Sequence, residues 1–507
     1  MSDQMKRAVT TILEAGFQVE IDAFRLLSDM EGKQDALNLL VQRLLNVAVA
    51  MEPRPISINR DLVIKAAEQL EIIVEPPSHV DLGLEHRRSF AEEIDSQLEV
   101  ISDPTGKLGT TGAFDDFLRY FRNRFEKMSG LLKQRMDTRN SGTIADALSA
   151  SANSKTRFVC MIMDKREKPG KIFLTVDDIG DEATVLVTEQ NQTVYQTARR
   201  LLRDQVLFIE AKKTNSQLLI AENILLPEIP ERRPAHSKEE VYAVLISDIH
   251  IGSKQFLKEP FDRVLGWLNG KLGTPQQRDI AGRVKYVMIG GDLVDGIGVY
   301  PRQEIDLQIP NIHEQYSESA KYIGQIPEHM SVVMIPGNHD AVRQALPQPM
   351  IPREYAGPVY DSRHIISLGD PSEVRLHGVH LLLYHGTSLM DLVSSVPGLD
   401  YQNPVSAMEY QLRARHLAPE YGKLTPIGPE QEDFLVIDRV PDIFTSGHIH
   451  VSGSGLYRGT TIINSGAWQG QTEYQKRMGV EPKPGILPVV NLKTLDVRMM
   501  NFITPQS

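Results

Sequence analysis

The stretch Val332-Val333-Met334-Ile335-Pro336-Gly337-Asn338-His339-Asp340 passes from an apolar, β-branched run directly into a set of polar side chains. The run Val332–Ile335 is typical of a buried strand, and Gly337 suits the sharp turn that must follow it. The polar side chains would then stand at the carboxyl end of a strand, where open α/β sheets build their sites. This stretch alone predicts an α/β domain with a polar site at one sheet edge.

Four more segments in the last half of the chain place polar side chains after an apolar run such as Val244–Ile246. They are Asp248-Ile249-His250, Gly291-Asp292, His385-Gly386 and Gly447-His448-Ile449-His450. Strand ends lying side by side would bring these carboxylates and imidazoles to one place. That collection suits two metal ions held close together, and two-metal sites stabilise the attacking and leaving oxygens of phosphate displacement. The sequence therefore predicts a phosphoesterase.

Seven residues are the candidate metal ligands: Asp248, His250, Asp292, Asn338, His385, His448 and His450. Asp248 and His250 are two residues apart and point to the same side of an extended segment, so they can hold one ion together. The carboxylate of Asp292 can bridge two ions with its two oxygens. Imidazole, carboxylate and amide oxygen without sulfur suit Mn or Mg, with Fe or Zn as the alternatives.

His339 is the candidate catalytic residue. It sits beside Asn338 but points the other way, so it is better placed to touch the substrate than a metal. There it could stabilise charge on the phosphate or protonate the leaving oxygen. Asp340 is expected to hold the imidazole through its other nitrogen, and Asp295 is expected to order a ligand or the incoming strand.

Bulk composition restricts the class of protein. The chain has 507 residues, enough for about three domains, and a single cysteine, which rules out a disulfide framework. It has no apolar signal core at Met1–Lys6 and no stretch able to span a bilayer, so we expect a cytoplasmic protein without membrane contact. The net charge of −11 argues against a free-standing binder of nucleic acid, so a DNA-directed role would need a partner.

The N-terminal part of the chain has a helical pattern. Over residues 1–75 apolar side chains such as Leu37, Leu40 and Leu44 recur at helix spacing and predict a small helical module, which suits partner docking. Residues 76–155 are expected to be a linker that carries one long amphipathic helix from Phe114. The basic face of this helix, which includes Arg124, could contact nucleic acid, but packing on a neighbouring domain is the preferred interpretation.

The period of apolar residues changes to two over residues 156–228. Five short strands with a helix near Val194–Leu202 after the third are the order of an OB-fold β-barrel. Few aromatic side chains are present to stack on bases, so a structural role is the better prediction. The aromatic side chains of the strands are Phe158, Phe173 and Phe208.

Over residues 239–507 strands first alternate with helices, and the later strands, from Glu373–Leu376 onward, are expected to follow one another without helices between them. The expected fold of this domain is an α/β arrangement in which a β-sandwich is flanked by helices on its outer faces.

The ordered series of motifs resembles that of the calcineurin-like metallophosphoesterases, over about half of the chain. The resemblance implies that one metal is held by Asp248, His250, Asp292 and His450. It implies that the other metal is held by Asp292, Asn338, His385 and His448, with His339 catalytic.

A narrower resemblance is to the small subunits of the archaeal D-family DNA polymerases. It is carried by 290–301, by 338–349 and by the segment from Gly466-Ala467-Trp468-Gln469 to Gln475-Lys476. The resemblance implies a 3′→5′ exodeoxyribonuclease that proofreads a single-stranded 3′ end in DNA replication. It also implies a large catalytic polymerase subunit as partner, in a heterodimer or a larger assembly.

Two alternatives remain at this point. One is a catalytically silent scaffold subunit of the polymerase, which the intact set of ligands disfavours. The other is a stand-alone phosphodiesterase or repair nuclease, and a barrel domain argues against the version that acts on small substrates. Stable association with a larger polymerase chain separates the last alternative from the other two hypotheses, and nuclease activity separates those two.

Overall fold

The computed structural model describes residues 3–19, 21–28, 34–49, 57–58, 60–70, 89–478 and 481–503. The chain divides into two compact units, Met1–Arg87 and Arg88–Ser507. Within the described stretches no helix is both long enough and apolar enough to cross a membrane. Residues 71–75 of the expected helical module and residues 76–88 of the expected linker lie outside the described residues.

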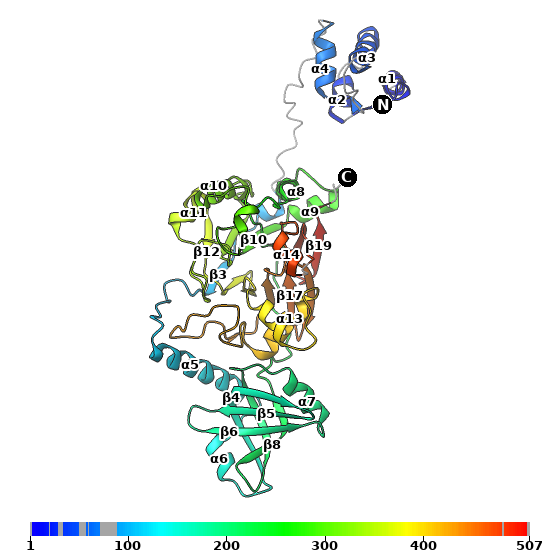
Figure 1. Cartoon of the computed structure of the whole chain (residues 1–507). Helices are drawn as coiled ribbons and strands as arrows, with labels where there is room; N and C mark the ends of the chain where they lie inside the picture. Colours follow the sequence, from blue (N-terminus) through cyan, green and yellow to red (C-terminus); the bar gives the residue numbers. More distant parts are fainter. Residues whose placement is uncertain are drawn as a thin grey trace. The chain divides into compact units, whose positions relative to one another are not determined.

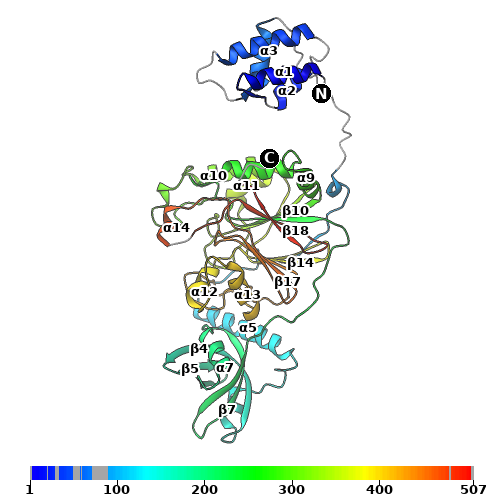
Figure 2. The same ribbon diagram turned by 90° about the vertical axis from the view of Figure 1, so that its right-hand side faces the viewer.

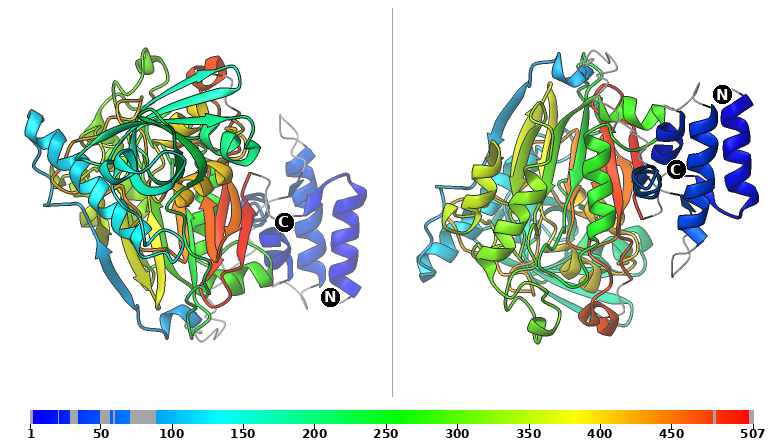
Figure 3. Two further views of the ribbon diagram at one scale, coloured as in Figure 1. Left: turned by 90° about the horizontal axis from the view of Figure 1, so that it is seen from below. Right: turned by 90° about the horizontal axis from the view of Figure 1, so that it is seen from above.

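The N-terminal unit, drawn in blue in Figure 3, is helical as expected. Its described helices are α1 (Asp3–Glu14), α2 (Ile21–Ser28), α3 (Gln34–Val49) and α4 (Arg60–Glu68). The periodic residues Leu37, Leu40 and Leu44 of α3 are fully buried in the core of this unit. Helix spacing of apolar residues therefore stabilises the unit by burying one stripe of each helix.

A closed β-barrel forms the first part of the second unit (Figure 1). Its strands are β4 (Lys155–Lys168), β5 (Lys171–Asp177), β6 (Glu182–Thr188), β7 (Val206–Lys213) and β8 (Leu218–Leu225), hydrogen-bonded in the order β4-β5-β6-β8-β7. Helix α7 (Gln192–Arg199) follows the third strand, as the sequence predicts. Phe158 and Phe208 are both buried, so the barrel lacks an exposed row of stacking aromatics among these predicted candidates.

Two six-stranded sheets make up the rest of the second unit. The first has the order β12-β11-β10-β9-β18-β19 and the second has the order β16-β17-β15-β14-β13-β3. The strands of the first sheet are β12 (Ile365–Ser367), β11 (Ser331–Ile335), β10 (Val284–Gly290), β9 (Tyr242–Ile246), β18 (Ile486–Asn491) and β19 (Val497–Asn501). Those of the second are β16 (Gly453–Tyr457), β17 (Thr460–Asn464), β15 (Ile443–Ser446), β14 (Val379–Leu383), β13 (Ser372–Leu376) and β3 (Leu98–Ser102).

The two sheets face each other, with helices on both outer faces (Figure 2). Alternate residues of a strand point to opposite faces, so Ala243 and Leu245 of β9 enter the core between the sheets while Val244 and Ile246 meet the helices. Helices on the first sheet are α8 (Lys258–Leu268), α9 (Pro275–Ala281), α10 (Ile312–Ile323) and α11 (Arg353–Ser362). Those on the second are α12 (Leu389–Ser395) and α13 (Pro404–Ala414).

Three sequence-based expectations need correction in this unit. Residues 98–102, expected to be linker, form edge strand β3 and pair antiparallel with β13. Residues 144–149, also expected to be linker, form the short helix α6 (Ile144–Ser149), which begins with a capping box between Thr143 and Asp146. Helices α12 and α13 separate β14 from β15, where strands alone were expected. The α12 and α13 residues on the sheet are buried and apolar, and such short segments have little detectable period.

Helix α5 (Phe114–Lys133) packs on the barrel, as preferred, and Phe121, Phe125, Met128 and Leu132 of the expected face take part, but the start of that face does not. Phe114 and Leu118, expected on the packed face, are 75% and 51% exposed. Arg124, expected on the solvated basic face, is buried and its Nε donates to Asp433 Oδ2 at 2.7 Å. The helix is therefore oriented by a buried ion pair as well as by its apolar residues, which periodicity alone cannot indicate.

Candidate metal centre

All eight predicted site residues follow the carboxyl ends of five strands, three from the first sheet and two from the second. Asp248 and His250 follow β9, and Asp292 follows β10. Asn338 and His339 follow β11. The remaining residues follow the second sheet, with His385 after β14 and His448 and His450 after β15. Strands β9, β10 and β11 are mutually parallel, and so are β14 and β15, so these ends meet at one edge of the two sheets.

Five of these residues have a left-handed backbone. The φ angles are 53° at Asp248, 54° at His250, 52° at Asp292, 68° at His448 and 61° at His450. Residues other than glycine are uncommon in this region, Asn, Asp and His being the most frequent, and such conformations cluster at functional sites. A Cβ at Gly337 would lie 2.2 Å from Asp292 Oδ1, so that position admits only glycine. The turns are therefore shaped to aim side chains inward.

Asp248, His250 and His450 form one group of close acceptor atoms. His450 Nε2 lies 3.3 Å from Asp248 Oδ1 and 3.1 Å from His250 Nε2. His250 Nε2 lies 3.9 Å from Asp248 Oδ1. All three side chains are buried. A single cation at this place could accept a ligand atom from each of the three residues.

Asp292, Asn338, His385 and His448 form a second group. His385 Nε2 lies 3.3 Å from Asp292 Oδ2 and 3.1 Å from Asn338 Oδ1. One ligand atom from each of Asp292, His385 and His448 lies within 4.8 Å of the others. Asp292 Oδ2 is also 3.7 Å from His250 Nε2, so this oxygen stands between the two groups.

The chemistry of these donors fits divalent cations. His385 Nδ1 lies 2.9 Å from the Gly290 carbonyl oxygen, so Nδ1 carries a hydrogen and donates it. The lone pair of Nε2 then faces two oxygens, which is repulsive unless a proton or a metal ion lies between them. Burial lowers the pKa of His385, but Asp292 outweighs burial and raises it to about 10. Without a metal, a proton takes the cation's place. The residues present therefore could hold two ions.

Polar residues behind the centre fix the orientation of the imidazoles. Asp295 Oδ1 lies 3.1 Å from His250 Nδ1 and accepts from Gln469 Nε2 at 2.9 Å. Gln475 Nε2 lies 2.9 Å from His450 Nδ1. Partners of this kind hold a ligand's ring in place and set which nitrogen is free. Asp295 was expected to order a ligand, whereas the contacts of the two glutamines were not anticipated.

Asp370 is a buried residue beside the centre that sequence reasoning missed. Its Oδ1 accepts from the backbone N–H of His385 at 2.9 Å, and burial raises its pKa to about 7. It lies three residues after the short strand β12, which the sequence analysis did not predict. Its contact with His385 arises only when the sheets form.

His339 faces the cavity, but it is held differently from the expectation. Its Nδ1 lies 2.7 Å from the carbonyl oxygen of Asp295, and a carbonyl only accepts, so Nδ1 is the donor. Asp340 instead accepts from the N–H of Gly337 and from the hydroxyl of Tyr316. Asp340 therefore stabilises the turn and not the imidazole. The Nε2 of His339 remains for substrate, although the ring also lies within the grouping of His250 and Asp292.

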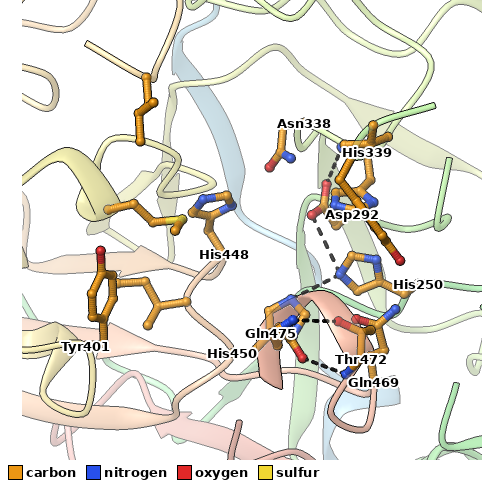
Figure 4. Close-up of a pocket in the computed structure, with 15 residues that line it drawn as sticks. His250, Asp292, Asn338, His339, Tyr401, His448, His450, Gln469, Thr472 and Gln475 are labelled. Atoms are coloured by element: carbon orange, nitrogen blue, oxygen red, sulfur yellow. Dashed lines mark hydrogen bonds and ion pairs between the residues drawn. The ribbon is translucent and has the colours of Figure 1, made fainter. Parts of the chain in front are cut away.

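A cavity of about 300 Å³ opens onto the centre (Figure 4). Asp292, Asn338 and His339 lie on one side of it, and Tyr401 lies across from them with His448 between. The cavity is also lined by Met390 and Leu424, and by Gln469 and Gln475 from the segment after β17. The lining thus combines the acceptor atoms with apolar and aromatic groups.

A known protein family matches the part of the chain that forms this centre. The family model for the B subunit of DNA polymerases alpha and epsilon matches residues 243–451, the stretch that holds every candidate ligand. The fold and the polar centre thus lie in a domain typical of the small B subunits of DNA polymerases.

Three curated relatives are closely similar, and each is described as a DNA polymerase II small subunit. The protein of Methanocaldococcus jannaschii is 39% identical over 80% of this chain and 68% of its own length. The protein of Archaeoglobus fulgidus is 41% identical over 77% of this chain and 78% of its own length. The protein of Methanothermobacter thermautotrophicus is 37% identical over 86% of this chain and 92% of its own length. The chain belongs to the family of archaeal DNA polymerase II small subunits.

Proposed function

We propose that the chain is the exonuclease subunit of a replicative DNA polymerase, removing nucleotides from a single-stranded 3′ end with two divalent metal ions. The observation that carries this proposal is the position of Asp292 Oδ2, 3.3 Å from His385 Nε2 and 3.7 Å from His250 Nε2. A carboxylate shared between two groups of ligands is what a dinuclear centre needs. The domain is accordingly a calcineurin-like phosphoesterase, and the barrel is an OB fold.

The ligand sets follow from the two groups of acceptors. Asp248, His250, Asp292 and His450 would hold one ion, and Asp292, Asn338, His385 and His448 the other. Mn or Mg are the expected ions, with Fe or Zn as alternatives, because the donors are oxygen and imidazole nitrogen. When bound, the ions supply a nucleophile at neutral pH and neutralise charge on the phosphate.

The residues of the chain itself have two further tasks. His339 donates through Nδ1 to the carbonyl oxygen of Asp295, which leaves Nε2 turned toward the substrate. Protonated at Nε2, it gives a hydrogen bond to a phosphate oxygen or a proton to the leaving oxygen. Asp295 and Gln475 hold His250 and His450 in the orientation that the ligands require.

The proposed partner is a large catalytic polymerase subunit, in a heterodimer or a larger assembly. The N-terminal unit has its own core and is proposed as a docking module over residues 1–75. The barrel of residues 156–228 and the phosphoesterase domain of residues 239–507 belong to the second unit, and within residues 76–155 strand β3 pairs with β13 and helix α5 packs on the barrel. The net charge of −11 supports a partner that makes most of the contacts with the DNA phosphates. The proposed location of the complex is the cytoplasm.

The test compares the variants Asp292→Asn and His339→Ala with the wild type, each as the full chain. Both changes are expected to lower Mn²⁺-dependent digestion of a 5′-labelled single-stranded oligonucleotide by at least about a hundredfold. The first weakens the ligand that both ions would share, and the second removes the group that would face the phosphate. Calorimetric titration should show two Mn²⁺ ions per wild-type chain and weaker binding to Asp292→Asn. The matched control is His313→Ala, a histidine of α10 that stacks on Tyr355 away from the centre.

Unchanged digestion by both site variants would refute the assignment of the site. Absence of digestion by the wild type with any of the four metals, together with a stable complex with the large subunit, would favour the silent scaffold.

A further inference from the structure

Part of the lining of the cavity is apolar. It is formed by Met390 of α12, by Tyr401 in the loop after α12 and by Leu424 in the loop after α13. Tyr401 lies across the cavity from Asn338 and His339 (Figure 4). We call these three residues, Met390, Tyr401 and Leu424, the apolar wall. It belongs to the same cavity as Asp292 and His339, so whatever binds at the centre also meets the wall.

Leu424 has an unusual position for an apolar side chain. It is 80% exposed, yet its backbone is held by a buried carboxylate. Asp391 Oδ1 accepts from the N–H of Leu424 at 3.1 Å, and Asp391 Oδ2 accepts from the N–H of Thr425 at 3.0 Å. Asp391 is only 8% exposed and follows Met390 in α12. The backbone at Leu424 is thus hydrogen-bonded to the residue that follows Met390 in α12, so these two members of the apolar wall are connected through Asp391.

We propose that the apolar wall binds the nucleobase of a nucleotide next to the scissile phosphodiester, against its flat face. This inference rests on the proposed function and specifies which part of the substrate the enzyme recognises. A phosphodiester at the acceptor groups carries its base a short distance away, and the apolar wall lines the same cavity, with Tyr401 across from Asn338 and His339. A tyrosine and two aliphatic side chains offer an apolar surface without sequence preference, because every base has such a face.

The size of the cavity adds a consequence for substrate choice. At about 300 Å³ it is at the lower end of pockets that hold small organic molecules. A base that is still paired would have to enter with its complement. The wall therefore selects strand ends whose last bases are unpaired, as they are in a single strand or at a mismatched primer.

The experiment compares two single-stranded oligonucleotides digested by the full chain with Mn²⁺. One has an ordinary 3′ end, and in the other the last two nucleotides are abasic. Wild type is expected to prefer the ordinary end by about tenfold in kcat/KM, from stacking of one base. Tyr401→Ala and Leu424→Ala are each expected to reduce this preference at least about threefold, through KM, while digestion of the abasic end stays within about twofold of wild type.

The matched control is Leu456→Ala, because Leu456 on β16 is also highly exposed, at 74%, and does not line the cavity. The control should keep the wild-type preference. An unaltered preference in Tyr401→Ala and Leu424→Ala, or an equal loss on both ends, would overturn the inference.

Failure of the proposed function has a different signature, namely no digestion of either oligonucleotide by the wild type. Binding of the same two oligonucleotides, measured by fluorescence anisotropy with Ca²⁺, then decides the inference alone. Preferential binding of the ordinary end that is lost in Leu424→Ala supports the wall, and equal binding of both ends by wild type rejects it.

Discussion

Asp295 is the residue on which the orientation of the centre most depends. Its carboxylate contacts His250, and its carbonyl oxygen accepts from His339, so one residue reaches both a candidate ligand and the candidate catalytic group. It is itself fully buried and is held by Gln303 and Gln469. Among the candidate ligands, the carboxylate contacts His250, so its effect on a bound metal ion would pass through that imidazole.

We expect Asp295→Ala to weaken Mn²⁺ binding by about 10- to 100-fold, the usual effect of losing a partner that orients a metal-bound histidine. Calorimetric titration of the full chain measures this directly. The matched control is Asp279→Ala, because the exposed carboxylate of Asp279 pairs only with Arg283 of the adjacent turn among the described ion pairs. Equal Mn²⁺ affinity in wild type and Asp295→Ala would mean that His250 needs no orienting carboxylate.

The candidate ligands could be predicted from sequence because each follows its own strand within a few residues. Their supporting partners could not. Gln303 and Gln469 reach the centre from outside the strand-end motifs, and a lone glutamine is usually a surface residue. Asp370 follows β12, a three-residue strand that was not predicted. For Asp340 the sequence predicted a contact that the structure lacks. Its position next to His339 suggested a hydrogen bond to that imidazole, but Asp340 accepts from the N–H of Gly337 and the hydroxyl of Tyr316.

Helix α5 is joined to the rest of the second unit by a buried polar network. Arg124 Nε donates to Asp433 Oδ2 at 2.7 Å, and His416 Nε2 lies 2.9 Å from the same oxygen. His416 Nδ1 accepts from the N–H of Ala418 at 3.0 Å, so the hydrogen of the neutral ring is on Nε2 and is donated to Asp433. Protonation of Nδ1 would break that bond. Burial accordingly lowers the pKa of His416 to about 4.

This network makes the stability of the chain sensitive to acid. His416 takes up a proton in the unfolded chain below its usual pKa of about 6.5 but in the folded chain only near 4. The unfolded state thus binds more protons between these values, and the free energy of unfolding falls as the pH decreases from about 6.5 to about 4. We expect a contribution on the order of 3 kcal/mol from this residue.

Urea denaturation at several pH values measures the slope, and the variant His416→Gln isolates the contribution. Glutamine can both donate to Asp433 and accept from Ala418 but does not titrate, so its slope over this pH range should be smaller than that of wild type. Identical slopes in the two proteins would show that His416 titrates alike in the folded and unfolded chain.

Elements with a local pattern could be predicted from sequence, and elements stabilised from a distance could not. The barrel strands and α7 were found because apolar residues alternate or recur within each segment. Strand β3 has a mixed pattern of half-exposed residues, and its partner β13 is far along the chain, with Arg375 and Glu99 276 residues apart. The burial of Arg124 on α5 was misjudged because it depends on Asp433, which is distant in sequence.

The division into two units implies that the N-terminal unit can be removed. Deletion of residues 1–87 should leave the Tm and the Mn²⁺-dependent digestion of the remaining chain unchanged, because the two units have separate cores. Binding to the large subunit should weaken if this unit docks. Scanning calorimetry, the oligonucleotide assay and size-exclusion chromatography with the large subunit measure the three quantities.

A longer deletion, of residues 1–102, is the control that should fail. It also removes β3 and uncovers the edge of β13, and we expect the Tm to fall by at least about 2 °C. An equal Tm in the two deletions would mean that β3 adds nothing to the sheet, and a fall in the shorter deletion would mean that the two units depend on each other.

The pairing of β3 with β13 also governs the order of events on the ribosome. β3 emerges before the barrel, but β13 is synthesised only after the barrel, β9, β10 and β11. During translation the early strand therefore remains an unpaired edge while the barrel behind it can already close. In nascent chains that end before residue 372, β3 therefore has no partner strand and is accessible to chaperones. The second sheet needs strands from both the early and the late part of the sequence.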